Sequence, residues 1–309
     1  MKLVNFLKEN SSRVGIIYEN HVIDIKYIIM TELAKEKLTL NIDIPNFISN
    51  KSHQKHVINF IKKLETLDQK ISEIPKDSIY ELKELHFLPP VLKPTKVIGV
   101  GLNYYSFING TGDKAPSYPE LFHKTSSSLT GNNQPILIPD VTQMVVPEGE
   151  LAVIIGKSGK YISESSALSY IGGYCCANDV NARDLEFRGT QWTSGKMLET
   201  FCPLGPFLIT PDEVKNPNNL KIETYLNGNI IQSGNTNDMI FNIQSLISQI
   251  SSVVTLELGD VILTGTSSDL GVGNSPVTLK KGDVVEVLIE GIGRLKNPVS
   301  NFNNITKTI

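Results

Sequence analysis

The chain has 309 residues, a formal net charge of −3 at pH 7 and a hydrophobic content of 40%. That length suits one large domain, or a small domain followed by a large one. The near-neutral charge gives no reason to expect nucleic acid or a membrane surface as a partner. The three cysteines form no C-x-x-C spacing, which argues against a zinc or iron–sulfur site and favours a reduced compartment such as the cytoplasm. No apolar run approaches the length of a membrane span.

The first ninety residues predict a small unit of strands and helices. Two apolar segments, residues 14–18 and 22–25, flank a polar dipeptide and predict a hairpin. Apolar residues at helical spacing predict an amphipathic helix over residues 57–71, and residues 78–85 favour a second, short helix. Three prolines then predict a stiff connection between an N-terminal domain, residues 1–88, and a larger domain, residues 89–309.

Strands outnumber helices in the larger domain and do not alternate regularly with them. Residues 96–101 read as a buried strand, and residues 105–118, rich in glycine and polar residues, read as a mobile loop. Asn227-Gly228 is a strong hairpin signal, residues 240–250 have helical periodicity, and residues 284–289 are expected as the last strand. The fold class is therefore α+β, mainly β, and not a Rossmann or β/α-barrel domain.

Three acidic residues lie at the ends of apolar strand-like runs. Glu148 and Glu150 precede the run 151–155, and the alternation of a strand places both carboxylates on one face. Asp179 ends a second apolar run, residues 171–177. Three carboxylates suit a hard divalent cation such as Mg²⁺ or Mn²⁺. The alternative, an exposed strand edge, fits poorly with the apolar residues that follow the pair.

Cationic and amide side chains follow the three acids. Arg183, Gln191 and Lys196 are suited to holding an anionic small-molecule substrate, and Lys124 is a further candidate for contact with a substrate carboxylate. The ordinary alternatives are that Gln191 closes a turn and that Lys124 is a surface lysine. Lys196 lies between a glycine and an apolar segment, which makes a surface role harder to accept.

Taken in order, the motifs of residues 89–300 resemble the fumarylacetoacetate hydrolase superfamily. The motifs that carry the resemblance are K-V-I-G-V-G-L-N-Y (96–104), E-G-E-L-A-V-I-I-G (148–156), G-Y-C-C-A-N-D-V-N-A-R-D (173–184), Q-W-T-S-G-K (191–196) and L-G-D-V-I-L-T-G-T (258–266). The Q-W-x-x-G-K form and N-G…Q-x-G-N-T (227–236) look most like the branch of ureidoglycolate lyase-like and 2,4-diketo-3-deoxy-sugar-acid hydrolase-like proteins.

The resemblance implies a mixed β-roll catalytic domain after a smaller N-terminal α/β domain, and a homodimer. It implies Mg²⁺ or Mn²⁺ held by Glu148, Glu150 and Asp179, with Lys196 as the catalytic lysine. The expected substrates are 2-oxo or 1,3-diketo acids, and the expected reaction is hydrolysis of a C–C bond through an enolate that the metal stabilises. The positions at which the family contacts substrate or supports the metal correspond to Arg183, Gln191 and Thr266. Tyr104 and Lys124 are further expected substrate-binding residues.

One departure from the family pattern concerns proton transfer. In hydrolytic members N-Y is commonly followed by x-x-H-x-x-E, a pair that activates water or moves a proton. Here Phe107 and Gly110 stand at those two positions, and neither side chain carries an exchangeable proton. A second difference is Glu186, where many members carry glutamine.

Three explanations remain open for the missing pair. Another base in the same segment, Asp113, His123 or Tyr105, replaces it. Alternatively, the reaction needs no activated water, as in a lyase, isomerase, dehydratase or decarboxylase working on the same metal-stabilised enolate. Finally, the protein binds a keto acid without turning it over, although the retained acids and lysine weigh against this.

Overall fold

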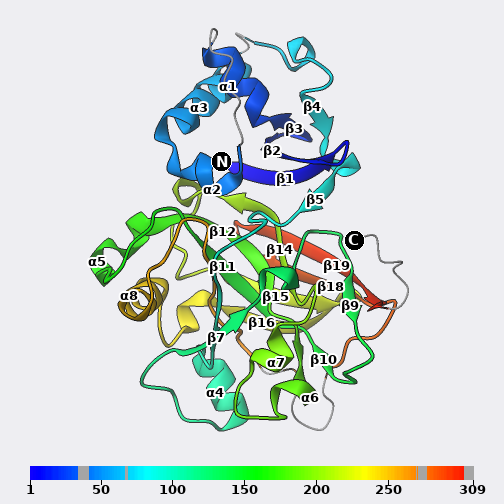
Figure 1. Cartoon of the computed structure of the whole chain (residues 1–309), viewed down its shortest axis with the longest axis vertical. Coiled ribbons are helices and arrows are strands. Elements are labelled where there is room, and N and C mark those ends of the chain that lie inside the picture. The colour runs from blue at the N-terminus through cyan, green and yellow to red at the C-terminus, as the bar shows by residue number, and fades with distance from the viewer. Residues whose placement is uncertain (34–41, 67–68, 269, 271–276, 303–309) are drawn as a thin grey trace.

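The computed structural model describes residues 1–33, 42–66, 69–268, 270 and 277–302. Within these residues the strands form one large sheet of 12 strands, a second sheet of five and a pair of two. Figure 1 shows the N-terminal elements, in blue and cyan, stacked above the strands and helices of the rest of the chain. The α+β, mainly β, class predicted from the sequence is confirmed.

The N-terminal elements in the described residues are β1 (Lys2–Lys8), β2 (Ser11–Tyr18), β3 (His21–Asp24), α1 (Ile25–Leu33), α2 (Ile44–Ser49), α3 (Lys51–Glu65), β4 (Ile79–Glu81) and β5 (His86–Leu88). The predicted hairpin is confirmed as β2 and β3, and the predicted amphipathic helix is α3, although α3 ends at Glu65 and not at residue 71. Helix α3 begins earlier than expected because Asn50 caps it, accepting a hydrogen bond from the backbone N–H of His53. The helix predicted over 78–85 is wrong: β4 pairs with β3, and residues 82–84 form a single 3₁₀ turn.

The N-terminal strands continue the large sheet. β1 pairs antiparallel with β14 (Cys202–Ile209), with Leu3 opposite Leu208. From one end to the other the strands run β4-β3-β2-β1-β14-β12-β11-β17-β6-β7, and β5 and β8 (Leu129–Thr130) pair with β1 and β14 off this path. The other members are β12 (Ile171–Asn178), β11 (Gly149–Ile155), β17 (Val261–Leu263), β6 (Val97–Gly101) and β7 (Glu120–Lys124).

Strand β11 lies near the middle of this sheet and is buried along its whole length. Its side chains alternate between two hydrophobic clusters, because Leu151 and Val153 pack in one and Ala152 and Ile154 pack in the other. A strand that faces a core on both sides needs an unbroken apolar run, and residues 151–155 supply it.

The smaller sheets lie beside the large one. The order of the five-stranded sheet is β16 (Asn229–Asn235), β15 (Lys221–Leu226), β18 (Val284–Ile289), β19 (Gly293–Asn301) and β9 (Ile136–Ile138), and β10 (Val145–Val146) pairs with β13 (Asn181–Ala182). The predicted Asn227-Gly228 hairpin is confirmed, and both residues have the positive φ, 51° and 83°, that a type I′ turn requires. Strand β18 was expected to be the last, but β19 follows it and pairs with it antiparallel.

The helices of this part are α4 (Tyr105–Thr111), α5 (Glu164–Ala167), α6 (Arg183–Glu186), α7 (Thr193–Lys196) and α8 (Ile243–Val253). The expected helix over 240–250 is α8, whose N-cap is Asn242. The first half of the expected loop over 105–118 is instead helix α4, because Phe107 and Ile108 are buried on one side of it. None of the described helices is long and apolar enough to cross a membrane.

Candidate active site

A cavity of about 230 Å³ lies beside the start of β11, between α4, α6 and α7. Its walls combine acidic, basic and aromatic side chains. The lining residues are Val100, Gly101, Leu102, Phe107, Asp113, Phe122, Glu148, Glu150, Asp179, Arg183, Glu186, Phe187, Trp192, Lys196 and Thr266. The three acids and Lys196 singled out in the sequence are therefore gathered around one cavity.

Neighbouring strands bring the three acids together. Glu148 directly precedes β11, Glu150 lies in it, and Asp179 directly follows β12, the antiparallel partner of β11. The backbone N–H of Asp179 donates to the carbonyl oxygen of Glu148 at 2.8 Å, which ties the two segments where they leave the sheet. All three side chains are buried, and one oxygen of each lies within 4.8 Å of the others.

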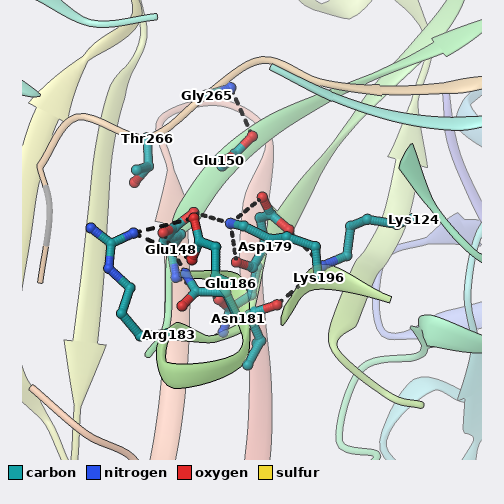
Figure 2. Close-up of polar contacts among 12 residues, drawn as sticks. Lys124, Glu148, Glu150, Asp179, Asn181, Arg183, Glu186, Lys196, Gly265 and Thr266 are labelled. Carbon is teal, nitrogen blue, oxygen red and sulfur yellow. Dashed lines mark hydrogen bonds and ion pairs between the residues drawn. The ribbon is translucent and has the colours of Figure 1, made fainter. Parts of the chain in front are cut away.

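Two buried lysines neutralise part of this negative charge. The Nζ of Lys196 lies 2.6 Å from Glu148 and 2.7 Å from Asp179. The Nζ of Lys124 lies 2.6 Å from the other oxygen of Asp179 and donates to the carbonyl oxygen of Val180 at 3.0 Å. Figure 2 shows the two lysines reaching Asp179 from β7 and α7. Asp179 thus bridges two ammonium groups that have almost no contact with water.

The pKa values of the acids follow from burial and from these neighbours. Burial raises the pKa of Glu148 to about 7, with Lys196 lowering it and Asp179 raising it. Burial, then the charges of Asp179 and Glu148, raise the pKa of Glu150 well above its ordinary value. Burial acts in the same direction on Asp179, but its two lysines outweigh burial and lower its pKa. Glu148 and Glu150 therefore lack the neighbouring positive charge that would offset the effect of burial on their pKa values.

The donor set fits a divalent cation. Glu150 accepts a 2.7 Å hydrogen bond from the backbone N–H of Gly265, and in the described residues it forms no ion pair. Glu148 accepts a second bond from the side-chain amide of Asn181 at 2.6 Å, which orients it toward the cavity. A buried carboxylate without a cation is costly, and a hard divalent ion among three carboxylate oxygens would remove that cost.

Helix α6 adds a second ion pair to the cavity. Residues three apart on a helix share a face, so Arg183 and Glu186 lie side by side with their charged groups 3.3 Å apart. The guanidinium of Arg183 also stacks over the ring of Phe187, 4.6 Å from its centroid. Glu186 is 3% exposed and lines the cavity, although its sequence position indicated only a departure from the family pattern. The i, i+3 spacing between Arg183 and Glu186 is the sequence feature that could have indicated their ion pair.

Aromatic rings form the wall of the cavity next to β6, with Phe122 from β7 and Trp192 from the residue before α7. Phe122 and Trp192 pack edge to face with centroids 6.0 Å apart, and Lys196 lies 5.1 Å from the Phe122 centroid. A side chain on either glycine of the G-V-G segment of β6 would collide with these rings: a Cβ at Gly99 would meet Phe122, and one at Gly101 would meet Trp192. These glycines therefore leave room for the aromatic wall.

The remaining predicted substrate-binding residues lie in different places. Thr266 lines the cavity, accepts a 2.6 Å hydrogen bond from Gln232 and donates to the carbonyl oxygen of Gly149. Tyr104 is fully buried and is not among the lining residues. Lys124 is likewise outside the lining, because its ammonium is held behind Asp179. Gln191 is exposed and also lies outside the lining, so the structure does not bring it to the acids.

The candidates for the missing proton-transfer pair are also separated. Phe107 lines the cavity, whereas Gly110 has open space around its Cα. Asp113 is exposed at the rim of the cavity. Strand β7 turns Phe122 inward and His123 outward, and the side chain of Tyr105 is exposed as well. Of the three bases proposed from the sequence, only Asp113 lines this cavity.

Gly195 allows α6 and α7 to approach each other. A Cβ at this position would lie 2.7 Å from the carbonyl oxygen of Ala182 and from the backbone nitrogen of Glu186.

We expect Gly195→Ala to push the two helices apart, to cost about 1–3 kcal/mol of unfolding free energy and to lower turnover by about 10²-fold. Urea denaturation and steady-state kinetics measure both. Gly189→Ala is the matched control, since a Cβ there meets no atom within 4 Å, and equal effects from both substitutions would contradict the prediction.

The raised pKa of Glu148 predicts a pH dependence of stability for the metal-free protein. Between about pH 4.5 and pH 7 the folded chain keeps a proton on Glu148 that the unfolded chain has lost. The free energy of unfolding should therefore fall as the pH rises through this window. Asp179, whose pKa is lowered, contributes the opposite slope, but only below its ordinary value of 3.8. Urea denaturation of chelator-treated protein at pH 5, 6 and 7 measures the slope, which Glu148→Gln should reduce; an unchanged slope would contradict the assignment.

A protein-family model described as "Fumarylacetoacetate (FAA) hydrolase C-terminal" matches residues 96–300. The chain belongs to the fumarylacetoacetate hydrolase family. The matched segment includes every residue around the cavity and excludes the N-terminal strands and helices. The family and the fold expected from the sequence motifs are therefore confirmed.

Several proteins similar to this chain have names that state an activity. The human protein "Oxaloacetate tautomerase FAHD2A, mitochondrial" is 46% identical over 219 residues, which is 70% of each chain. The solved structure of 5-carboxymethyl-2-hydroxymuconate delta-isomerase from Mycobacterium smegmatis is 29% identical with a TM-score of 0.72, covering 97% of this chain and 100% of that one. These relatives are named as a tautomerase and an isomerase, which agrees with the isomerase alternative that the sequence left open.

A third family member carries a metal ion. The structure of maleylpyruvate hydrolase from Sphingobium sp. SYK-6 "in complex with manganese (II) ion and pyruvate" is 26% identical with a TM-score of 0.73, covering 97% of this chain and 99% of that one. A divalent ion is thus bound within the family, and the present chain has a buried group of three carboxylates. The ureidoglycolate lyase-like branch expected from the sequence stays a prediction.

Proposed function

We propose that this protein is a divalent-metal-dependent tautomerase of a small 2-oxo acid. It moves a proton between the oxo oxygen and the neighbouring carbon without breaking a C–C bond. The observation that carries the proposal is Phe107 on the cavity wall, where hydrolytic relatives are expected to place a histidine. A phenyl ring neither activates water nor protonates a leaving carbon, whereas a tautomerisation needs neither step.

The charged residues of the cavity suit this reaction. Glu148, Glu150 and Asp179 would hold Mg²⁺ or Mn²⁺, whose charge stabilises negative charge on the oxygen of a 2-oxo acid. Lys196 holds two of these carboxylates in place and adds a positive charge on the same side of the cavity. The rings of Phe107, Phe122 and Trp192 form an apolar wall beside these charges, which strengthens the electrostatic interactions.

The size and charge of the cavity favour a small acid such as oxaloacetate. A volume of about 230 Å³ is below the usual range of sites for drug-sized ligands, about 300–1,000 Å³. Arg183 presents a guanidinium on the cavity wall, and this group pairs well with a carboxylate. Oxaloacetate is also the substrate named for the human relative.

The proposal is tested with oxaloacetate and the purified protein in the presence of Mg²⁺ or Mn²⁺. Ketonisation of the enol form is followed by ultraviolet absorbance, and pyruvate release is measured in the same samples. We expect metal-dependent ketonisation without pyruvate, and its loss after chelation. Pyruvate formation at the same rate, or no acceleration by the metal-loaded protein, would overturn the proposal.

Hydrolysis of a C–C bond is the second candidate. It is favoured by Asp113, because a carboxylate at the rim of the cavity is placed to activate water, and one solved structural relative is a maleylpyruvate hydrolase. Acylpyruvates in the same assay distinguish the two reactions. Their cleavage, abolished by Asp113→Asn, would favour hydrolysis. Tight metal-dependent binding of oxalate without any turnover would instead indicate a binding protein.

The proposed compartment is the cytoplasm. Its support is chemical: Cys175, Cys176 and Cys202 are free thiols and are buried, as suits a reducing environment. The human relative carries the word mitochondrial in its name, so fractionation of the source cells tests this proposal. Recovery with an organelle marker would contradict it.

A further inference from the structure

We propose that Glu186 is the catalytic residue that moves the proton to and from carbon. The inference rests on the proposed tautomerase function and assigns the role left vacant by Phe107. Glu186 is 3% exposed and lines the same cavity as the three acids and Lys196. Figure 2 shows its side chain beside Glu148 and Lys196, on the side from which Arg183 approaches.

Glu186 differs from the three acids of the metal group in its partner, because it is paired with Arg183 and not with a lysine. Its carboxylate lies 3.3 Å from the guanidinium of Arg183, and the described group of three metal-binding acids does not include it. The guanidinium of Arg183 holds this carboxylate in position on the cavity wall.

The other charged groups of the cavity are less suited to this role. The Nζ of Lys196 donates to Glu148, to the side chain of Asp179 and to its carbonyl oxygen, so its three hydrogens all have acceptors and it presents no lone pair. Asp113 is exposed at the rim and accepts a 2.7 Å hydrogen bond from Thr111, and water solvates it. Glu186 combines burial with a place on the cavity wall, and its two hydrogen bonds from Arg183 are long, at 3.4 and 3.3 Å.

The proposed step is a proton transfer between carbon and a carboxylate oxygen of Glu186. In the keto-to-enol direction, a carboxylate oxygen of Glu186 takes a proton from the carbon next to the oxo group. The electrons of the broken C–H bond form the C=C bond, and the electrons of the C=O π bond move to oxygen. Water protonates that oxygen, and Glu186 returns its proton to water, so the enzyme ends in its starting state. The enol-to-keto direction is the reverse.

Glu186→Gln tests the assignment, because glutamine keeps the shape and can still hydrogen-bond to Arg183 but cannot take the proton. In metal-loaded protein in D₂O, proton NMR follows the exchange of the hydrogens next to the oxo group of oxaloacetate. We expect exchange and ketonisation to fall by about 10²–10⁴-fold, with Mn²⁺ affinity measured by calorimetry unchanged within about threefold.

Glu186→Asp, which keeps a carboxylate, should retain more activity than Glu186→Gln. The matched control is the exposed Glu164→Gln, which should leave the rates unchanged.

The outcomes separate this inference from the proposed function. If the wild-type protein exchanges and Glu186→Gln exchanges equally fast, the role of Glu186 is refuted and the tautomerase proposal stands. If Glu186→Gln is active and Asp113→Asn is not, the base is Asp113. A wild-type protein that neither exchanges nor ketonises overturns the tautomerase and this inference with it. A purely structural role for Glu186 predicts equal loss in Glu186→Asp and a lowered melting temperature in both variants.

Discussion

Asp179→Asn is expected to lower the free energy of unfolding of the metal-free protein by about 3–5 kcal/mol. The substitution keeps the shape of the side chain but removes the charge that pairs with two ammonium groups, Lys124 at 2.6 Å and Lys196 at 2.7 Å. Lys124 has no exposed surface, so water cannot replace the lost partner. Urea denaturation after treatment with a chelator measures the loss without a contribution from bound metal.

A matched substitution on the surface gives the reference for this loss. The side chain of Asp212 is 68% exposed and lies 3.9 Å from the N-terminal ammonium, so Asp212→Asn should change stability by less than about 1 kcal/mol. Added Mn²⁺ should stabilise the wild type and the Asp212 variant, and should stabilise Asp179→Asn much less. Equal stability of the two variants would show that Asp179 does not compensate the two lysines.

Lys196→Met is expected to reduce turnover by about 10²–10³-fold. It should leave Mn²⁺ affinity unchanged or raise it. The ammonium of Lys196 bonds Glu148 and Asp179, so its removal leaves more negative charge for a cation while the cavity loses its positive charge. Ketonisation of oxaloacetate and titration calorimetry with Mn²⁺ measure the two effects separately.

Lys124→Met is the control for this prediction. It removes an equivalent ammonium from the other oxygen of Asp179, but from a position outside the cavity lining. We expect it to destabilise the protein while lowering turnover by no more than about tenfold. If the two variants lose activity equally, Lys196 acts only by holding Asp179, and its charge at the cavity contributes nothing further.

Local sequence patterns predicted the elements whose burial or turn geometry is set by neighbouring residues. Adjacent residues determine the structure of β11 and β12, which are apolar runs, and of the Asn227-Gly228 turn. The same is true of the three acids, because alternation and the ends of two runs already place them together. Their association is confirmed by the distances between their oxygens.

Elements that depend on distant partners were not predicted. Residues 79–81 form a strand because β3 is available to pair with them, and nothing in their own spacing indicates it. Helix α4 has a composition typical of loops, but burial of Phe107 and Ile108 compensates for it. The role of Lys124 was likewise set by its neighbours in space: the pleat of β7 points it inward to Asp179, 55 residues along the chain.

The hydrogen bond from Gly265 to Glu150 joins residues 115 positions apart, across β17 and β11. Such a contact needs the central strands to be paired in register, so we expect the group of three acids to be completed late in folding. Interactions absent from the folding transition state slow unfolding and leave the folding rate nearly unchanged. An ion bound at this site should therefore slow the unfolding of the native chain and leave its folding rate nearly unchanged.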